Sequence, residues 1–162
     1  MDVQKVTLRR MTPSEYEAAT RHREAAVVLE LAKRMPEEPA RERVRRGTAQ
    51  YLPDGLDTAD HHLLSAVNES GEVVGTAWIG PDPREAFGTA TSAWLYDLHV
   101  FAAFRRHGYG SAVLAAAERL VAAEGLTSLA LNVLGDNEAA IALYRRSGYG
   151  VSAMYLQKDV QR

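Results

Sequence analysis

The first third of the chain contains one strand pattern followed by two helix patterns. Residues 3–9 alternate apolar and polar side chains, which is typical of a half-buried strand. Residues 12–15, Thr-Pro-Ser-Glu, predict a helix start, because they supply an N-cap, a proline at the first helical position and the glutamate of a capping box. This helix is expected to end at about Arg34, and the arginine-rich residues 41–50 predict a second, more exposed helix.

Three strand patterns occupy the middle of the chain. Residues 62–69 and 72–79 alternate apolar and polar positions on either side of a Ser-Gly pair, which is typical of a hairpin. Residues 93–101 are rich in aromatic and β-forming side chains and predict a central strand. A loop at residues 81–88 is expected to join the hairpin to this strand.

The last third alternates helices and strands. Residues 111–124 repeat apolar side chains at helical spacing, and residues 127–134 read as a buried strand. A further helix is expected from an N-cap at Asp136 to Gly148, and residues 151–158 alternate as a last strand. The order β-αα-ββ-β-α-β-α-β predicts an α/β fold, with a mixed central sheet flanked by helices.

Composition limits the class of protein. A chain of 162 residues with 46% hydrophobic residues can build the core of one domain. Lys and Arg number 19 against 21 Asp and Glu, so no overall basic field favours nucleic acid or an anionic membrane. The absence of cysteine excludes disulfides, a cysteine nucleophile and cysteine-bound zinc. No apolar run suits a signal peptide or a membrane span, so we expect a cytoplasmic protein.

The sequence Arg-Arg-His-Gly-Tyr-Gly at residues 105–110 lies between the central strand and the following apolar helix. Its glycines leave backbone N–H groups uncovered at the helix start, where unpaired donors and the helix dipole favour phosphate oxygens. Arg105 adds positive charge. Glycines at such places also serve simply to make a tight turn, so this segment alone leaves both interpretations open.

A second motif follows the next strand. Residues 137–149 read Asn-x-x-Ala-x-x-Leu-Tyr-x-x-x-Gly-Tyr. In order and spacing, this segment and Arg-x-x-Gly-x-Gly at residues 105–110 resemble the two acetyl-CoA motifs of the GNAT superfamily of N-acetyltransferases. The resemblance covers residues 93–158, while the earlier residues match only in their coarse order of elements.

The resemblance implies a single GNAT-like N-acetyltransferase domain over residues 1–162, with an acceptor side at about 1–90 and an acetyl-CoA side at about 91–158. The implied reaction transfers an acetyl group from acetyl-CoA to a primary amine, without a metal. The first helices, residues 52–60 and the loop 81–88 would wall the acceptor side. A small metabolite, an antibiotic, a polyamine and a protein N-terminus all fit as acceptors. Homodimers are common in the superfamily, but no stretch here specifies one.

The resemblance also assigns residues to acetyl-CoA. The backbone of Leu98, His99 and Val100 is expected to pair with the pantetheine arm like an added strand. The amides of residues 107–111 are expected to hold the pyrophosphate. Asn137 would bond the cofactor arm, although a local hydrogen bond at the helix start explains this residue equally well without the resemblance. The complete expected set is Leu98, His99, Val100, Arg105, Arg106, His107, Gly108, Tyr109, Gly110, Ser111, Asn137 and Tyr144.

Tyr144 matches the superfamily's tyrosine that points at the coenzyme sulfur, so the resemblance implies that it is the general acid. A phenol suits this role, because its ordinary pKa of about 10 keeps it protonated at neutral pH. By helical spacing alone, Tyr144 would instead be a core aromatic residue with its hydroxyl bonded elsewhere.

The general base is harder to assign. Some members of the superfamily place Glu or His five residues before the motif asparagine, but this chain has Asn132 there, and an amide cannot take a proton. We therefore expect Asp97 to receive the amine's proton, directly or through water, with Tyr96 lining the same site. Strict alternation would send these two side chains to opposite faces, so both face the acceptor only if a β-bulge intervenes, as is usual in the superfamily. A structural role for Asp97, with solvent as base, stays open.

Two other classes of function fit the sequence less well. A non-catalytic acyl-CoA-binding or sensing module would keep the glycine turn, but Tyr144 argues against it. A nucleotide-phosphate enzyme fits poorly, because the turn lacks the Gly-Lys-Ser/Thr ending of a P-loop. No metal-ligand spacing is present among four histidines expected at surface or turn positions, His61, His62, His99 and His107.

Overall fold

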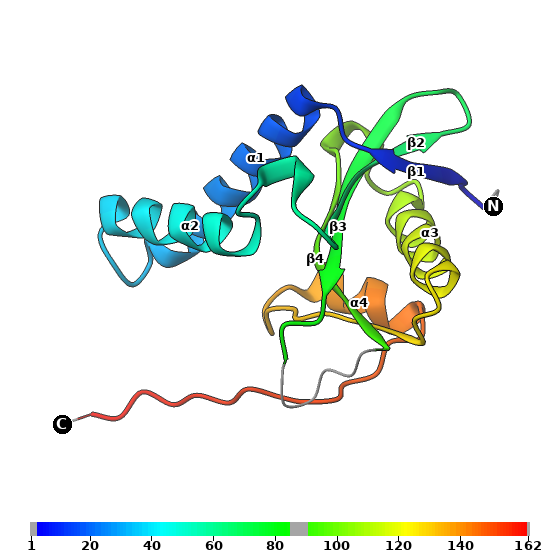
Figure 1. Ribbon diagram of the computed structural model, residues 1–162. Coiled ribbons are helices and arrows are strands. Elements are labelled where there is room, and N and C mark those ends of the chain that lie inside the picture. The colour runs from blue at the N-terminus through cyan, green and yellow to red at the C-terminus, as the bar shows by residue number, and fades with distance from the viewer. Residues whose placement is uncertain (1–2, 85–90, 162) are drawn as a thin grey trace. The chain divides into compact units, whose positions relative to one another are not determined.

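The computed structural model of the chain describes residues 3–84 and 91–161 (Figure 1). These residues belong to two units: unit 1 ends at Leu131, and unit 2 begins at Asn132. Unit 1 holds, in chain order, β1 (Val6–Arg10), α1 (Pro13–Leu31), α2 (Glu37–Tyr51), η1 (Gly55–Asp57), β2 (His62–Asn68), β3 (Val73–Pro81), β4 (Ser92–Val100), η2 (Ala102–Phe104), α3 (Tyr109–Ala123) and β5 (Ser128–Ala130). Unit 2 holds α4 (Glu138–Arg146).

The strands of unit 1 form one mixed sheet in the order β1-β2-β3-β4-β5. The pairs β1–β2, β2–β3 and β3–β4 are antiparallel, as expected for strands joined by short connections. The pair β4–β5 is parallel, because α3 crosses over between these two strands. The predicted class, an α/β fold with a mixed sheet flanked by helices, is therefore confirmed.

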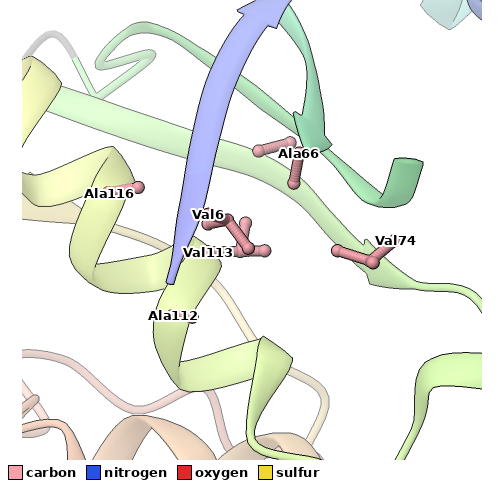
Figure 2. Packing of buried hydrophobic residues seen from close by; sticks show 7 residues of the cluster. Val6, Ala66, Val74, Ala112, Val113 and Ala116 are labelled. Carbon is pink, nitrogen blue, oxygen red and sulfur yellow. The ribbon is translucent and has the colours of Figure 1, made fainter. Parts of the chain in front are cut away.

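One face of the sheet packs on α3, which lies along one side of the strands while α1 and α2 lie on the other (Figure 1). The small size of the residues at this contact lets the helix approach the sheet closely, and burying them is the main stabilising contribution of this layer. Figure 2 shows these residues, of which Val113 is fully buried: Val6, Ala66, Val74, Ala112, Val113 and Ala116.

The other face of the sheet is covered by the start of α1 and the segment after α2. Met11, Leu52, Leu63 and Trp78 are buried together there, with Tyr96 packed against them. This second core matters for function because it fixes the positions of the aromatic side chains on β3 and β4.

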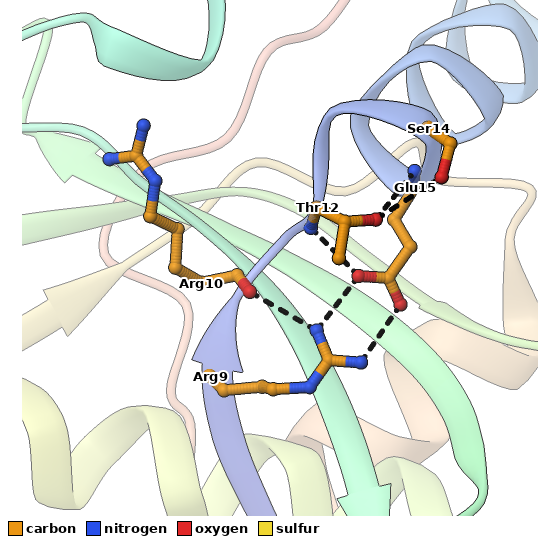
Figure 3. A network of polar contacts seen from close by, with 5 residues as sticks. All are labelled: Arg9, Arg10, Thr12, Ser14 and Glu15. Atoms are coloured by element: carbon orange, nitrogen blue, oxygen red, sulfur yellow. Dashed lines mark hydrogen bonds and ion pairs between the residues drawn. The ribbon is translucent and has the colours of Figure 1, made fainter.

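The start of α1 is fixed by the predicted capping box, which is confirmed. Glu15 donates its N–H to the Thr12 hydroxyl at 3.2 Å, and the Thr12 N–H donates to the Glu15 carboxylate at 2.8 Å (Figure 3). Arg9 on β1 adds two hydrogen bonds to the same carboxylate, at 2.8 and 3.0 Å. The network therefore joins β1 to the start of α1, which covers the second core.

Three local expectations are wrong. Residues 151–158, the expected last strand, form no strand in the described part of unit 2, and their side chains are exposed. Alternation is not sufficient there, because a strand also needs a hydrogen-bonded neighbour. Of the expected strand 127–134, only Ser128–Ala130 forms β5. The N-cap of α4 is Asn137 rather than Asp136, since the Asn137 side chain accepts the Ala140 N–H.

Candidate functional site

The turn between β4 and α3 leaves backbone donors uncovered. Gly108 is the N-cap of α3, with φ 83° and ψ 8°, and makes no side-chain cap. The Ala112 N–H donates to the Gly108 carbonyl at 3.2 Å. The N–H groups of Tyr109, Gly110 and Ser111 precede this bond, so the helix itself gives them no partner. The positive φ at this position favours a glycine, because a residue with a side chain is strained there.

A second left-handed residue lies in the same turn. Arg106 has φ 62°, which is uncommon and strained for a residue with a side chain. Left-handed residues close together in a turn direct backbone N–H groups toward one side and form anion-binding concavities. Arg105, Arg106, His107 and Gly108 are all exposed, so the turn is accessible to an anionic ligand.

Two side chains tie the turn to the sheet. Arg105 Nε donates to the carbonyl of Val100, the last residue of β4, at 3.2 Å. The hydroxyl of Tyr109 lies 3.2 Å from Asn68 Nδ2, and its ring meets Phe104 edge-on at 5.9 Å. Tyr109 therefore packs against the sheet, and only its backbone is left for a ligand at the turn.

The edge of β4 that faces β5 is only partly paired. β5 pairs with Ser92, Ala93 and Trp94, while β3 pairs with β4 along its other edge as far as Val100. Among the described residues of the sheet, no strand pairs with the β5-facing edge of β4 after Trp94. The expected cofactor-binding residues Leu98, His99 and Val100 belong to this edge, which could hold an extended ligand by strand-like hydrogen bonds.

A β-bulge interrupts the pairing of β4 with β3. Trp78 pairs with Asp97 and Ile79 with Leu95, so Tyr96 is the extra residue. Tyr96 stacks on Trp78, with ring centroids 4.5 Å apart, and Asp97 shares the register position of Trp78. The bulge therefore turns both Tyr96 and Asp97 toward the face beneath α1, as the sequence required if both are to face the acceptor.

Aromatic rings surround Tyr96. Trp78 stacks on it, and Tyr51 and His61 each lie 5.5 Å away between ring centroids. The Tyr96 hydroxyl donates to the Pro81 carbonyl at 2.5 Å, and burial raises the Tyr96 pKa to about 12. This phenol keeps its proton at any physiological pH, so Tyr96 can line and shape the site but cannot act as its base.

The surroundings of Asp97 shift its pKa in opposite directions. Burial raises its pKa, while the positive charge of Arg23, the neighbouring His22 and the Leu98 N–H lower it, and burial is the largest effect. The Arg23 guanidinium lies over the Trp78 ring, 4.6 Å from its centroid. A carboxylate whose pKa is raised toward neutrality is better suited to accept a proton than an exposed aspartate.

Two histidines expected at surface or turn positions instead belong to this face. His61 Nδ1 accepts a hydrogen bond from Trp78 Nε1 at 2.9 Å, and a Cβ at Gly80 would collide with its ring. His99 stacks on His22 at 3.9 Å, and burial lowers the His99 pKa to about 4. His61 follows a turn, as expected, whereas the expectation is wrong for His99, because periodicity does not show which helix covers a strand.

The other two histidines lie elsewhere. His62 Nε2 is 2.5 Å from Glu124 Oε1, and His107 is exposed in the glycine turn. Across residues 3–84 and 91–161, no group of three His, Cys, Asp or Glu side chains is arranged to hold a metal ion. None of the helices in these residues has the length and apolar character needed to cross a membrane.

Sequence reasoning missed three residues of this face: His22, Arg23 and Trp78. Trp78 could have been found, because pairing the predicted hairpin with the central strand places it near Asp97. His22 and Arg23 had no such signal, since α1 lacks a clear apolar stripe and its rotation about its axis cannot be read from the sequence.

The remaining expected residues belong to unit 2. Asn137 Oδ1 accepts the Ala140 N–H at 3.2 Å, so its local role at the start of α4 is present. Tyr144 is half-buried in α4, and its ring centroid lies 5.8 Å from that of Tyr149. Glu85–Gly88, the second part of the expected acceptor loop, lie outside the described residues.

Known acetyltransferases resemble this chain in sequence and in fold. The sequence model described as "Acetyltransferase (GNAT) family" matches residues 25–149. The uncharacterized N-acetyltransferase YdgE of Bacillus subtilis (strain 168) is 28% identical over 124 residues, which are 76% of this chain and 77% of YdgE. The uncharacterized N-acetyltransferase YycN of the same organism is 30% identical over 109 residues, 67% of this chain and 68% of YycN. The crystal structure of YycN superposes with a TM-score of 0.86 and 25% identity, covering 98% of this chain and all of that chain.

Proposed function

Because the chain belongs to the acetyltransferase (GNAT) family, whose members transfer acyl groups, we propose that it transfers the acetyl group of acetyl-CoA to a primary amine. The observation that carries this proposal is the continuity of two ligand-binding features in unit 1. The β5-facing edge of β4, unpaired after Trp94, leads directly into the turn whose amides precede the first bond of α3.

Unit 1 would hold two parts of acetyl-CoA in different ways. The N–H groups of residues 107–111, with the charges of Arg105 and Arg106, would bind the pyrophosphate, because the helix dipole and the uncovered donors both favour anions. Backbone groups of Leu98, His99 and Val100 would bind the pantetheine arm. In unit 2, the proposed contribution to the same arm is the amide of Asn137.

The proposed reaction is a direct attack. The amine nitrogen forms a bond to the thioester carbonyl carbon, and the tetrahedral intermediate then loses the thiolate as the carbon–sulfur bond breaks. Asp97 takes the proton that the amine loses, directly or through water. Tyr144 gives a proton to the thiolate, so coenzyme A leaves as the free thiol.

The arrangement around Asp97 supports its role as base. Its side chain faces the same side as Tyr96, and burial raises its pKa. Tyr96 and Trp78 would line the acceptor position without exchanging protons, since the Tyr96 hydroxyl is committed to Pro81. The raised pKa of the Asp97 carboxylate thus supports its role as the group on β4 that receives the proton.

The test is thiol release from acetyl-CoA, measured across a library of primary amines. The proposal predicts amine-dependent release for at least one class of acceptor. Tight binding of acetyl-CoA without amine-dependent release across the library would instead identify a non-catalytic acyl-CoA-binding module and contradict the proposal.

A further inference from the structure

Arg23 of α1 lies over the same face of the sheet as Tyr96 and Asp97, the face proposed to bind the acceptor. Its guanidinium stacks on the Trp78 ring at 4.6 Å, and burial is the main effect that lowers its pKa. Its one described hydrogen bond goes to the Thr20 hydroxyl, at the long distance of 3.5 Å. A guanidinium stacked on a ring still presents its N–H groups around the edge of its plane, as a fork that matches a carboxylate.

The nearby Asp97 carboxylate opposes the effect of burial and raises the Arg23 pKa. Asp97 of β4 pairs with Trp78 of β3, and the Arg23 guanidinium lies over the Trp78 ring. Both charges therefore lie over the β3–β4 pair. Yet none of the ion pairs found in residues 3–84 and 91–161 joins the Arg23 guanidinium to the Asp97 carboxylate. The two opposite charges therefore attract one another without forming a direct ion pair.

Leaving the Arg23 guanidinium and the Asp97 carboxylate without a direct ion pair costs free energy. A partly desolvated guanidinium without an anion has lost hydration that its hydrogen bonds do not replace, and the same holds for the carboxylate. A ligand with a negative group for Arg23 and a positive group for Asp97 would satisfy both and add no net charge to the site.

We propose that the acceptor carries a carboxylate close to its amine, with the carboxylate bound by Arg23 and the amine directed at Asp97. The simplest such molecule is a free α-amino acid. This inference rests on the proposed function, because Asp97 is the group that takes the amine's proton. It adds a specificity residue on α1, and it assigns Arg23 to the acceptor rather than to coenzyme A.

The charges favour a carboxylate over a phosphate. A phosphate carries more negative charge and would face the Asp97 carboxylate, whereas a carboxylate with its own ammonium is balanced against the pair. An uncharged amine or a polyamine would leave Arg23 unpartnered, and a polyamine would add positive charge beside it. The position of Arg23 therefore favours amino acids over other primary amines as acceptors.

The experiment compares three matched sets of acceptors: the free L-amino acids, the amides of the same amino acids, and the amines left after removal of the carboxyl group. Rates of thiol release are compared at equal concentrations of unprotonated amine, because the three sets have different amine pKa values. We expect kcat/KM for the preferred amino acid to exceed that for its amide by roughly 10- to 100-fold, the range for one charge-assisted contact.

Arg23→Gln removes the charge and keeps most of the length that packs on Trp78. It should remove the preference for the carboxylate by raising KM for the amino acid. Any effect of the lost charge on Asp97 is shared by the amino acid and its amide, so the ratio of their kcat/KM values should fall toward one. Arg23→Lys should keep part of the preference, since the charge stays but the fork is lost. Arg21→Gln, an exposed arginine of the same helix, is the matched control and should behave as wild type.

Each outcome decides one claim. Equal turnover of amides and amino acids by the wild-type protein, or a preference for the carboxylate that survives in folded Arg23→Gln, overturns this inference while leaving amine acetylation intact. Turnover in none of the three sets also overturns this inference, while the proposed function is decided separately by thiol release across the wider library of primary amines. Circular dichroism and thermal unfolding of each variant establish that it is folded.

Discussion

The ring of Tyr96 stacks on the ring of Trp78, with centroids 4.5 Å apart and planes inclined by 16°, although Tyr96 and Asp97 are neighbours on one strand and both face α1. The bulge at Tyr96 makes this possible by adding one residue to β4 between the pairs Trp78–Asp97 and Ile79–Leu95. A regular strand would have turned either the aromatic ring or the carboxylate toward α3. The proposed chemistry therefore depends on one irregular residue in the central strand.

Replacing Asp97 by Asn keeps the shape of the side chain and removes its ability to take a proton. The rate should fall most at low pH, where little free amine exists, and recover in part at high pH. A pH–rate profile of Asp97→Asn measures this, with the exposed Asp159→Asn as control. A profile that overlays wild type would eliminate Asp97 and leave solvent as the proton acceptor.

The same substitution makes an independent prediction about stability. Because burial raises the Asp97 pKa in the folded protein, the folded state binds that proton more tightly than the unfolded state. Ionised Asp97 therefore costs stability as pH rises through and above its folded pKa. Asp97→Asn should unfold at a higher temperature than wild type at neutral pH, and the difference should shrink toward acid pH, as thermal unfolding at several pH values can establish.

Gly108→Val tests the turn. Valine at φ 83° is strained, and its side chain would occupy space beside the amides proposed to bind the pyrophosphate. We expect acetyl-CoA affinity to be lost in calorimetric titrations. Gly125→Val is a matched control, because Gly125 has φ 80° and no atom near its Cβ position, at the opposite end of α3. Unchanged affinity in a folded Gly108→Val protein would remove the phosphate site from this turn.

Tyr144→Phe removes only the hydroxyl of the proposed general acid. Turnover should fall by roughly a hundredfold or more, with little change in acetyl-CoA affinity. Tyr155→Phe, at an exposed tyrosine of unit 2, should have no effect. Wild-type turnover by Tyr144→Phe, measured where chemistry limits the rate, would show that the thiolate takes its proton from elsewhere.

Glu15→Gln tests the anchor at the start of α1. Hydrogen bonds from Arg9 lower the Glu15 pKa to about 2, so the ionised carboxylate stabilises the fold above its ordinary pKa. This contribution is lost as pH falls from about 4.5 toward 2. Glutamine at this position can still accept the Thr12 N–H, so the loss comes from the charge that binds Arg9. We expect Glu15→Gln to lose up to about 1 kcal/mol at neutral pH, the upper value for an exposed ion pair, and the exposed Glu17→Gln to lose none. Equal denaturation midpoints for both variants would contradict the anchor.

Local signals in the sequence predicted much of the architecture. The capping box at Thr12, the hairpin, the central strand and the turn at Gly108 are all present, because each depends on residues close together in the chain. The strand expected at residues 151–158 depends instead on a partner that alternation cannot supply.

The candidate site could likewise be predicted only where it depends on residues close together in the chain. Asp97 and Tyr96 could be selected from the central strand, and the need for a bulge could be stated, but its position could not. Arg23 and His61 come to this face through the rotation of α1 and through the space that Gly80 leaves, which are properties of packing. Sequence periodicity carries little information about either of them.

The most direct measurement of the central claim uses acetyl-CoA that carries an isotopic label in its acetyl group. After incubation with the protein and the amine panel, mass spectrometry locates the label, and a thiol reagent counts the coenzyme A released. The account predicts labelled acetyl on the nitrogen of the amine, in equal amount to the free thiol and dependent on Tyr144 and Asp97. Thiol release that is the same without any amine, or no labelled amine in the whole panel, would contradict it.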